Sequence, residues 1–158
     1  MEIQEINIDG FGKFHKYNAQ TSGKIQVFYG KNESGKTTIR KFMTVMLFGL
    51  EKARGVAARN DDHTRYIPIN GGNYGGSITI KKGQTSYKIM RRFEKGQTML
   101  RMFYADTMEE IELPSPTLQN ILFEADKFVF ENTVSMTQAD IRTGREMKEM
   151  LQNSMANL

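Results

Sequence analysis

The apolar side chains of this chain recur with two different spacings. Alternation of apolar and polar residues predicts strands, and recurrence every three or four residues predicts a helix. Residues 3–8 alternate between apolar and polar, which predicts a strand. Residues 25–29 carry no charge, which is typical of a strand buried on both faces of an α/β sheet. From Thr37 the apolar side chains recur every three or four residues and share one face of a helix, which Gly49 should end. These side chains are Ile39, Phe42, Met43, Met46, Leu47 and Leu50.

The second half of the chain predicts an antiparallel meander. Residues 77–81, 86–93 and 99–105 alternate like half-buried strands. Lys-Gly-Gln triplets at 82–84 and 95–97 separate them and supply the glycine that a tight hairpin needs.

Glycine pairs and polar stretches predict the turns and loops. Asp9-Gly10, Gly71-Gly72 and Gly75-Gly76 mark turns. Residues 52–66 are polar and have no apolar period, so we expect an irregular segment that is mobile without nucleotide.

Three further elements are expected towards the end of the chain. Pro114-Ser115-Pro116 starts a short helix, and residues 128–136, which open with an apolar run, predict a strand. Thr143 with Glu146 makes a capping box for a final helix. The pattern as a whole predicts one α/β domain over residues 1–158, with a mixed sheet around the strand that precedes the central helix, an antiparallel β arm and a few helices.

Composition narrows the class of protein. With 158 residues, 39% of them hydrophobic and 25% charged, the chain is long enough to bury a core. It has no cysteine, which excludes disulfides and cysteine–zinc sites and permits a reducing cytoplasm. The start is neither basic nor continuously apolar, and no stretch is long enough to cross a bilayer, so no membrane partner is expected. The net charge of +4 is compatible with a polyanionic partner without requiring one.

Residues 30–37 match the pattern G-x-x-x-x-G-K-[ST], between an expected buried strand and an expected helix. The glycines let successive N–H groups face phosphate oxygens, and the helix start adds its positive dipole end. Lys36 supplies charge to the β and γ phosphates, and Thr37 offers its hydroxyl to magnesium. The motif predicts a P-loop that binds ATP with Mg²⁺. Its residues are Gly30, Lys31, Asn32, Glu33, Ser34, Gly35, Lys36 and Thr37.

A P-loop alone does not complete a hydrolase, which also needs an acid at a strand end and a group that orients water. Glu131 closes the apolar run 128–130, but it is not the usual Asp, and we interpret it as the solvated end of a core strand. Two other classes stay open: a self-contained small kinase-like P-loop enzyme with the arginines of residues 52–65 in its lid, and a non-hydrolysing nucleotide-sensing module. A GTPase is disfavoured because Asn-Lys-x-Asp is absent.

Four stretches follow one another in a characteristic order. They are INIDGFGKF at residues 6–14, YGKNESGKTT at 29–38, RYIPINGGNYGG at 65–76 and FENTVSMTQ at 130–138. In this order the chain resembles the N-terminal half of the SMC-like ATPase heads of RecF, SbcC and YhaN-type DNA-repair proteins. The four stretches are similar to the first strand, the P-loop, a YhaN-like segment and the strand that leads into the Q-loop.

The resemblance implies further site residues. Gln138 would be the Q-loop residue, whose side-chain oxygen reaches magnesium or the attacking water, so it is the expected catalytic residue and a metal ligand beside Thr37. Thr38 would complete the P-loop, and Lys13 would touch the α-phosphate or the sugar. Basic residues of the meander lie where family heads can meet DNA. They are Lys81, Lys82, Lys88, Arg91, Arg92, Lys95 and Arg101.

The resemblance also implies an ATP-driven switch within a larger protein. Two heads would sandwich two ATP molecules, each P-loop facing the signature of the opposite head. The implied partners are ATP, the C-terminal lobe of the same head, a second head in a homodimer, DNA and a nuclease subunit. The signature, the strand-ending Asp-Glu pair and the histidine switch are not found in this sequence. We therefore expect an N-terminal part that binds nucleotide without hydrolysing it alone, with residues 143–158 as the root of a coiled coil.

Overall fold

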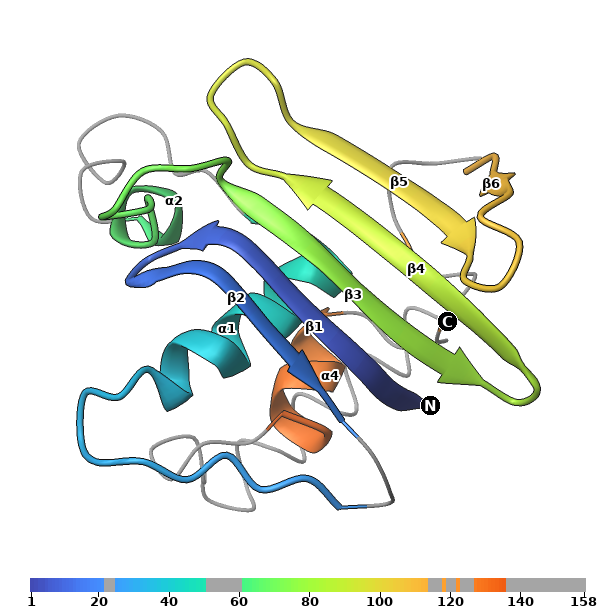
Figure 1. Cartoon of the computed structure of the whole chain (residues 1–158), viewed down its shortest axis with the longest axis horizontal. Helices are drawn as coiled ribbons and strands as arrows, with labels where there is room; N and C mark the ends of the chain where they lie inside the picture. The colour runs from blue at the N-terminus through green and yellow to red at the C-terminus, as the bar shows by residue number, and fades with distance from the viewer. Residues whose placement is uncertain (22–24, 51–60, 114–117, 119–121, 123–126, 136–158) are drawn as a thin grey trace. The chain divides into compact units, whose positions relative to one another are not determined.

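The computed structural model describes residues 1–21, 25–50, 61–113, 118, 122 and 127–135. The chain divides into two units, Met1–Leu118 and Gln119–Leu158, and each is described by itself. In the first unit a six-stranded sheet packs against helix α1, and the short helix α2 (Asp62–Arg65) lies near one end of the sheet (Figure 1).

The sheet is antiparallel between every pair of neighbouring strands, in the order β2-β1-β3-β4-β5-β6. The first strand of the chain lies inside it, because β2 pairs with one edge of β1 and the distant β3 with the other. The strands are β1 (Glu2–Phe11), β2 (Phe14–Gln20), β3 (Gly75–Lys82), β4 (Thr85–Arg92), β5 (Met99–Tyr104) and β6 (Glu110–Ile111).

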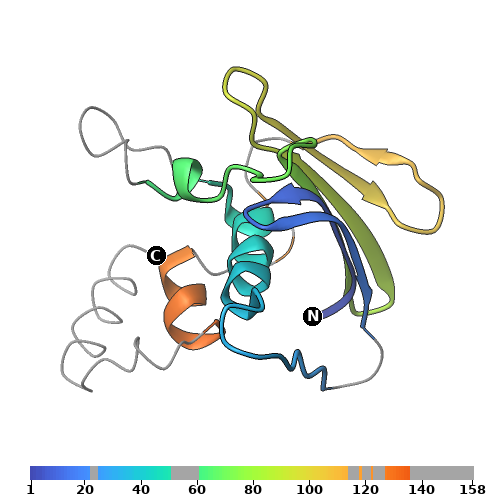
Figure 2. The same ribbon diagram turned by 60° about the vertical axis from the view of Figure 1, so that its left-hand side comes forward.

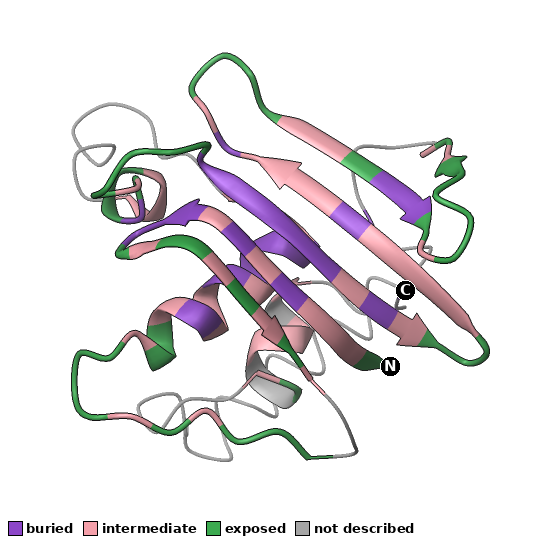
Figure 3. Cartoon of the chain, viewed as in Figure 1, coloured by how far each residue is buried: buried purple, intermediate pink, exposed green. Residues whose placement is uncertain are grey.

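A row of apolar residues crosses four strands and forms the centre of the core, and buried positions on these strands are purple in Figure 3. Ile6 of β1 lies opposite Ile78 of β3, Ile78 opposite Ile89 of β4, and Ile89 opposite Met102 of β5. All four side chains are fully buried. Because side chains alternate between the faces of a strand, this register assigns one face of the sheet to the core.

Helix α1 (Lys36–Phe48) covers the core face of the sheet (Figure 2). Four residues of its apolar stripe are buried, namely Ile39, Phe42, Met46 and Leu47, and Phe42 packs edge-on against Phe11 with ring centroids 5.3 Å apart. The helix ends at Gly49, whose φ of 87° is left-handed and whose N–H donates to the carbonyl of Val45 at 2.8 Å. Both the helix and its end confirm the sequence prediction.

Arg91 of β4 holds the end of α1 against the sheet. Its Nε donates to the carbonyl of Met46 at 2.8 Å and its Nη2 to the carbonyl of Leu47 at 3.2 Å. Burial lowers the pKa of the Arg91 guanidinium to about 10. The last carbonyls of a helix have no partner within the helix, so this side chain supplies donors that the helix itself lacks.

The predicted meander is confirmed by strands β3, β4 and β5, which are joined by the two Lys-Gly-Gln triplets. Gly83 and Gly96 have φ of 62° and 85°. These values lie in the left-handed region where glycine is favoured, so each glycine allows its connection to reverse direction.

Residues 25–29 were expected to form a buried strand, and this prediction is wrong for the structure. The segment is irregular, and Ile25, Val27 and Tyr29 are 83%, 73% and 98% exposed. A buried strand needs neighbouring strands at its edges and packed layers on both faces, and the six described strands pair among themselves. The described residues therefore form an antiparallel sheet with helices and not a mixed sheet around residues 25–29.

Residues 128–136 were expected to form a strand, and here too the structure differs. In the second unit, residues Lys127–Thr133 form helix α4, and the N–H groups of Val134 and Ser135 both donate to the carbonyl of Phe130 at 2.9 Å. A short apolar run suits a buried strand and a buried helix equally well, and periodicity cannot separate them. Glu131 consequently lies in a helix and not at the end of a strand.

Two predicted turns are wrong, and one strand was not predicted. Asp9-Gly10 lies inside β1, Gly75-Gly76 begins β3, and β2 occupies a stretch that the sequence left unassigned. A Cβ on Gly10 would lie 2.9 Å from both Pro68 Cγ and the Asn73 carbonyl oxygen, so this glycine allows close approach of a neighbouring segment.

Several predictions fall on residues outside the described part of the chain. They concern the helix start at 114–116, the final helix from Thr143 with the expected coiled-coil root, and residues 52–60 of the segment 52–66. The described end of that segment was expected to be irregular and instead contains helix α2. No helix among the described residues is long and apolar enough to cross a membrane.

Candidate functional site

The loop of residues 30–35 leads into α1, and its backbone enters the left-handed region twice. Glu33 has a φ of 63° and Gly35 a φ of 101°. The N–H of Ser34 donates to the carbonyl of Lys31 at 3.1 Å. Left-handed residues within such a turn direct successive N–H groups towards one concave side, which suits an anion. Because α1 starts at Lys36, its positive dipole end adds to the same site.

The Lys36 side chain folds back across this loop. Its ammonium group donates to the carbonyls of Gly30 at 2.7 Å and Lys31 at 2.8 Å, and lies 3.5 Å from the Ser34 hydroxyl. The side chain remains exposed, so these contacts fix the position of the charge and leave it accessible. A fixed ammonium group beside N–H donors can bind phosphate through charge-assisted hydrogen bonds.

The loop has no room for side chains at its two glycines. A Cβ on Gly30 would lie 2.5 Å from the Ser34 hydroxyl oxygen. A Cβ on Gly35 would lie 2.6 Å from Cζ of Phe14, whose ring packs against the loop backbone. A side chain at Gly30 would displace the Ser34 side chain, and one at Gly35 would displace the Phe14 ring and also be strained by the left-handed φ.

Lys13, in the turn between β1 and β2, reaches the same loop. Its ammonium group donates to the carbonyl of Glu33 at 2.6 Å. The structure thus brings a second cation to this loop, as the resemblance implied for a nucleotide contact. Contact between Lys13 and a nucleotide stays a prediction.

The other predicted residues of the loop line its surface. Lys31, Asn32, Glu33, Ser34 and Thr37 are exposed. Thr38 is half-buried, and its Cγ2 would lie 3.3 Å from a Cβ on Gly12.

The expected metal ligands are not brought together by the described residues. Thr37 lies at the start of α1, whereas Gln138 falls outside the described part of the chain, and the strand expected before it is helix α4. No group of three or more His, Asp or Glu side chains suited to a metal occurs among the described residues.

Sequence reasoning missed Gly12 and Phe14, which flank Lys13. Gly12 has a φ of 54°, and Phe14 packs against Gly35. The available signal was the aromatic and basic stretch 11–17, which the pattern left without an element or a role.

We predict that Gly35→Ala weakens nucleotide binding. The left-handed conformation costs a residue with a Cβ about 1–2 kcal/mol, and the Phe14 ring must also shift. If the loop relaxes to avoid this, affinity for Mg·ATP should fall by about fivefold to thirtyfold in a titration with a fluorescent ATP analogue.

Gly96→Ala is the matched control, because Gly96 has a φ of 85° and a Cβ added there would meet nothing within 4 Å. It should lose stability through the same strain while keeping its affinity for nucleotide. Equal affinities of wild type and Gly35→Ala would show that binding does not need this backbone conformation.

Comparison with known proteins also points to a nucleotide-binding domain. The profile of a family described as AAA domain matches residues 1–157. The uncharacterized protein YhaN of Bacillus subtilis (strain 168) is 38% identical over 79 residues, which make up 49% of this chain and 7% of that protein. The match thus spans a small part of the relative's length.

The glycine loop, its lysine and the helix that follows define an ATPase-type nucleotide-binding module. The chain belongs to the AAA-domain family, as an N-terminal region of the SMC, RecF, SbcC and YhaN-like ATPases.

Proposed function

We propose that this chain is the ATP-binding N-terminal half of an SMC-like ATPase head, in a larger protein that acts in DNA repair or recombination. The observation that carries the proposal is the position of Lys36, whose ammonium group is held by the carbonyls of Gly30 and Lys31 where α1 begins. A nucleoside triphosphate brings the charge and the phosphate oxygens that this arrangement can bind.

Magnesium would be held next to the phosphates. Thr37 has an exposed hydroxyl in the first turn of α1, a position from which it can reach a metal bound to the β and γ phosphates. In the proposal Gln138 contributes its side-chain oxygen to the metal or orients the attacking water. The metal would neutralise charge that develops on the phosphates.

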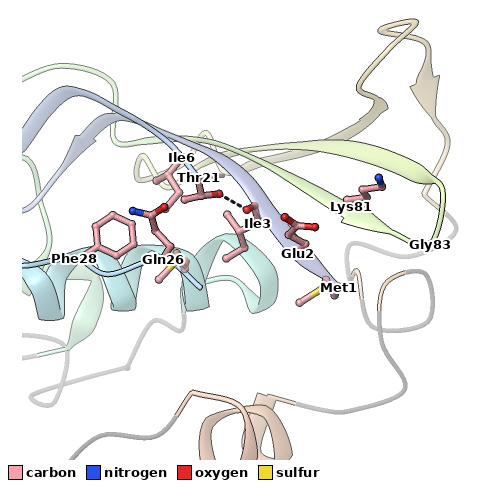
Figure 4. A pocket seen from close by; sticks show the side chains of 10 residues that line it. Met1, Glu2, Ile3, Ile6, Thr21, Gln26, Phe28, Lys81 and Gly83 are labelled. Atoms are coloured by element: carbon pink, nitrogen blue, oxygen red, sulfur yellow. Dashed lines mark hydrogen bonds between the residues drawn. The ribbon is translucent and has the colours of Figure 1, made fainter. Parts of the chain in front are cut away.

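The exposed segment before the loop supports a further lobe as partner. Gln26 and Phe28 line two hollows, of about 630 Å³ and 350 Å³. The larger one also has Ile3, Ile6 and Met43 in its wall (Figure 4). A segment with a strand-like sequence and hollows beside it can accept neighbouring strands. We propose that strands of the C-terminal lobe of the same head pair with residues 25–29.

DNA, a second head and a nuclease subunit complete the proposed partners. Arg91 is used inside the fold, Arg92 pairs with Asp9, and Arg101 pairs with Glu110 at 2.5 Å. If the meander contacts DNA, its lysines are candidates as well. They are Lys81, Lys82, Lys88 and Lys95.

We predict that the 158-residue chain alone hydrolyses ATP far more slowly than the ordinary enzyme range of about 1 per second and above. Phosphate binding is not enough, because the transition state needs further placed groups. Adding the C-terminal lobe, in one chain or in trans, should raise turnover. In that assembly Gln138→Ala should reduce turnover more than it reduces ATP binding.

One result would contradict the proposal that this chain is the N-terminal half of an ATPase head. If the chain alone turned over ATP at about 1 per second and lost this activity on Lys36→Ala, it would be a self-contained enzyme of the kinase-like class. If it bound ATP and gained no turnover with the lobe, a non-hydrolysing sensing module would be favoured.

A further inference from the structure

The turn between β1 and β2 contacts the P-loop on one side. Lys13 donates to the Glu33 carbonyl at 2.6 Å, and the Phe14 ring packs against Gly35. These two contacts involve the two left-handed residues of the loop. The Lys13 ammonium group contacts the Glu33 carbonyl directly, and the Phe14 ring contacts Gly35. A rearrangement of the P-loop backbone should therefore also move the turn.

The same turn contacts the segment of residues 66–72, hereafter the 66–72 loop, on its other side (Figure 1). The N–H of Gly12 donates to the Tyr66 carbonyl at 2.8 Å, and the N–H of Ile69 donates to the Gly12 carbonyl at 2.9 Å. Both backbone groups of one turn residue are thus used by the 66–72 loop. The next residue along the chain, Lys13, is the one that reaches the P-loop.

Side chains of the hairpin reinforce this second contact. His15 Nδ1 lies 3.1 Å from the Gly71 carbonyl oxygen. A Cβ on Gly72 would lie 2.8 Å from the same nitrogen, and a Cβ on Gly10 would lie 2.9 Å from Pro68. Glycines at these places allow the 66–72 loop to pack directly against the hairpin.

The far side of the 66–72 loop is open to solvent. Ile67 and Ile69 are 48% and 77% exposed, and a hollow of about 570 Å³ lies beside Ile67, Pro68 and Tyr74. Helix α2 anchors the start of the segment, because Asp62 pairs with Lys41 of α1 at 2.6 Å. The loop is therefore fixed at its base, while its apolar side chains remain accessible.

We infer that the β1–β2 turn couples the P-loop to the 66–72 loop, so that bound nucleotide stabilises the exposed surface around Ile67 and Ile69. The inference rests on the proposed function, because it needs nucleotide at the P-loop. Phosphate offers the Lys13 ammonium group an acceptor of opposite charge, which adds Coulomb attraction to the hydrogen bond. The turn is then held more firmly, and Gly12 passes this restraint to Tyr66 and Ile69. Because coupling between sites is reciprocal, a ligand of the 66–72 loop would also change nucleotide affinity.

Amide hydrogen exchange measured by NMR tests the coupling at single residues. With saturating Mg·ATP, the N–H groups of Gly12 and Ile69 should exchange at least about fivefold more slowly, the low end of typical coupling between sites. The N–H of Ile89, in the middle of β4, serves as an internal reference whose exchange should not change.

Lys13→Met separates coupling from binding. At ATP concentrations that saturate this variant, the P-loop amides should be protected as in the wild type, while the protection of the Ile69 N–H should be lost. Lys16→Met is the matched control: Lys16 is an exposed lysine of the same hairpin, and this variant should retain the protection.

The outcomes distinguish the inference from the proposed function. If ATP binds and protects the P-loop of the wild type but leaves the Ile69 N–H unchanged, the coupling is wrong and the proposed function stands. If Lys13→Met keeps full protection at Ile69, the relay through the turn is wrong. If ATP does not bind at all, both ideas fail.

Discussion

Lys36→Ala is expected to reduce ATP affinity by about tenfold to a hundredfold. The substitution removes the full charge that the carbonyls of Gly30 and Lys31 hold beside the N–H donors and the start of α1. A hydrogen bond to a charged group contributes about 1.5–3 kcal/mol, and each 1.4 kcal/mol is about a factor of ten in affinity. The fold should survive, because the side chain is exposed. Titration with a fluorescent ATP analogue and a circular dichroism spectrum measure both effects.

Lys95→Ala provides a control with the same change in net charge. Lys95 lies in the connection between β4 and β5, outside the P-loop. Its removal should leave affinity within about twofold, since exposed charges beyond a Debye length of about 10 Å are largely screened. Equal affinities of Lys36→Ala and the wild type would mean that residues 30–37 are not the phosphate site.

Arg91→Met should lower the free energy of unfolding by about 2–4 kcal/mol. Methionine retains the apolar stem but leaves the carbonyls of Met46 and Leu47 without their donors. An unsatisfied polar group at a partly buried site costs about 1–3 kcal/mol. Part of this loss is offset, because burial already disfavours the charged guanidinium and lowers its pKa to about 10. Urea denaturation followed by circular dichroism gives the difference.

Arg101→Met, on the neighbouring strand, is the comparison for this effect. Arg101 pairs with Glu110 on the surface, where solvent and salt screen the attraction, so its loss should change stability far less than the loss of Arg91. If both variants lost equal stability, the contact between Arg91 and the end of α1 would have no special role.

The sequence allowed prediction of those elements whose signals are local. The stripe from Ile39 to Leu47 and the glycine after it are sufficient to predict α1, because helix periodicity and capping depend on near neighbours. The hairpins around Gly83 and Gly96 follow from turn chemistry in the same way. The P-loop motif likewise identified the loop that holds the Lys36 ammonium group.

Elements whose state depends on distant partners could not be predicted. Residues 25–29 have the composition of a buried strand, but a strand also needs neighbours, and the sequence does not show where these come from. Gly10 was taken for a turn because the close approach of Pro68, far along the chain, cannot be read from a local pattern. The packing of Phe14 on Gly35 was missed for the same reason.

The interior position of β1 has a consequence for synthesis of the chain on the ribosome. β1 and β2 emerge first and can form a hairpin at once, but the second edge of β1 stays without a partner until β3 has left the ribosome. An unpaired edge can pair with other chains, and pairings between distant segments form slowly. The residues of the P-loop and α1 are made during this interval, while the face of the sheet that α1 covers is still incomplete. A nascent chain should therefore gain its nucleotide site only after the β3–β4 hairpin has been made.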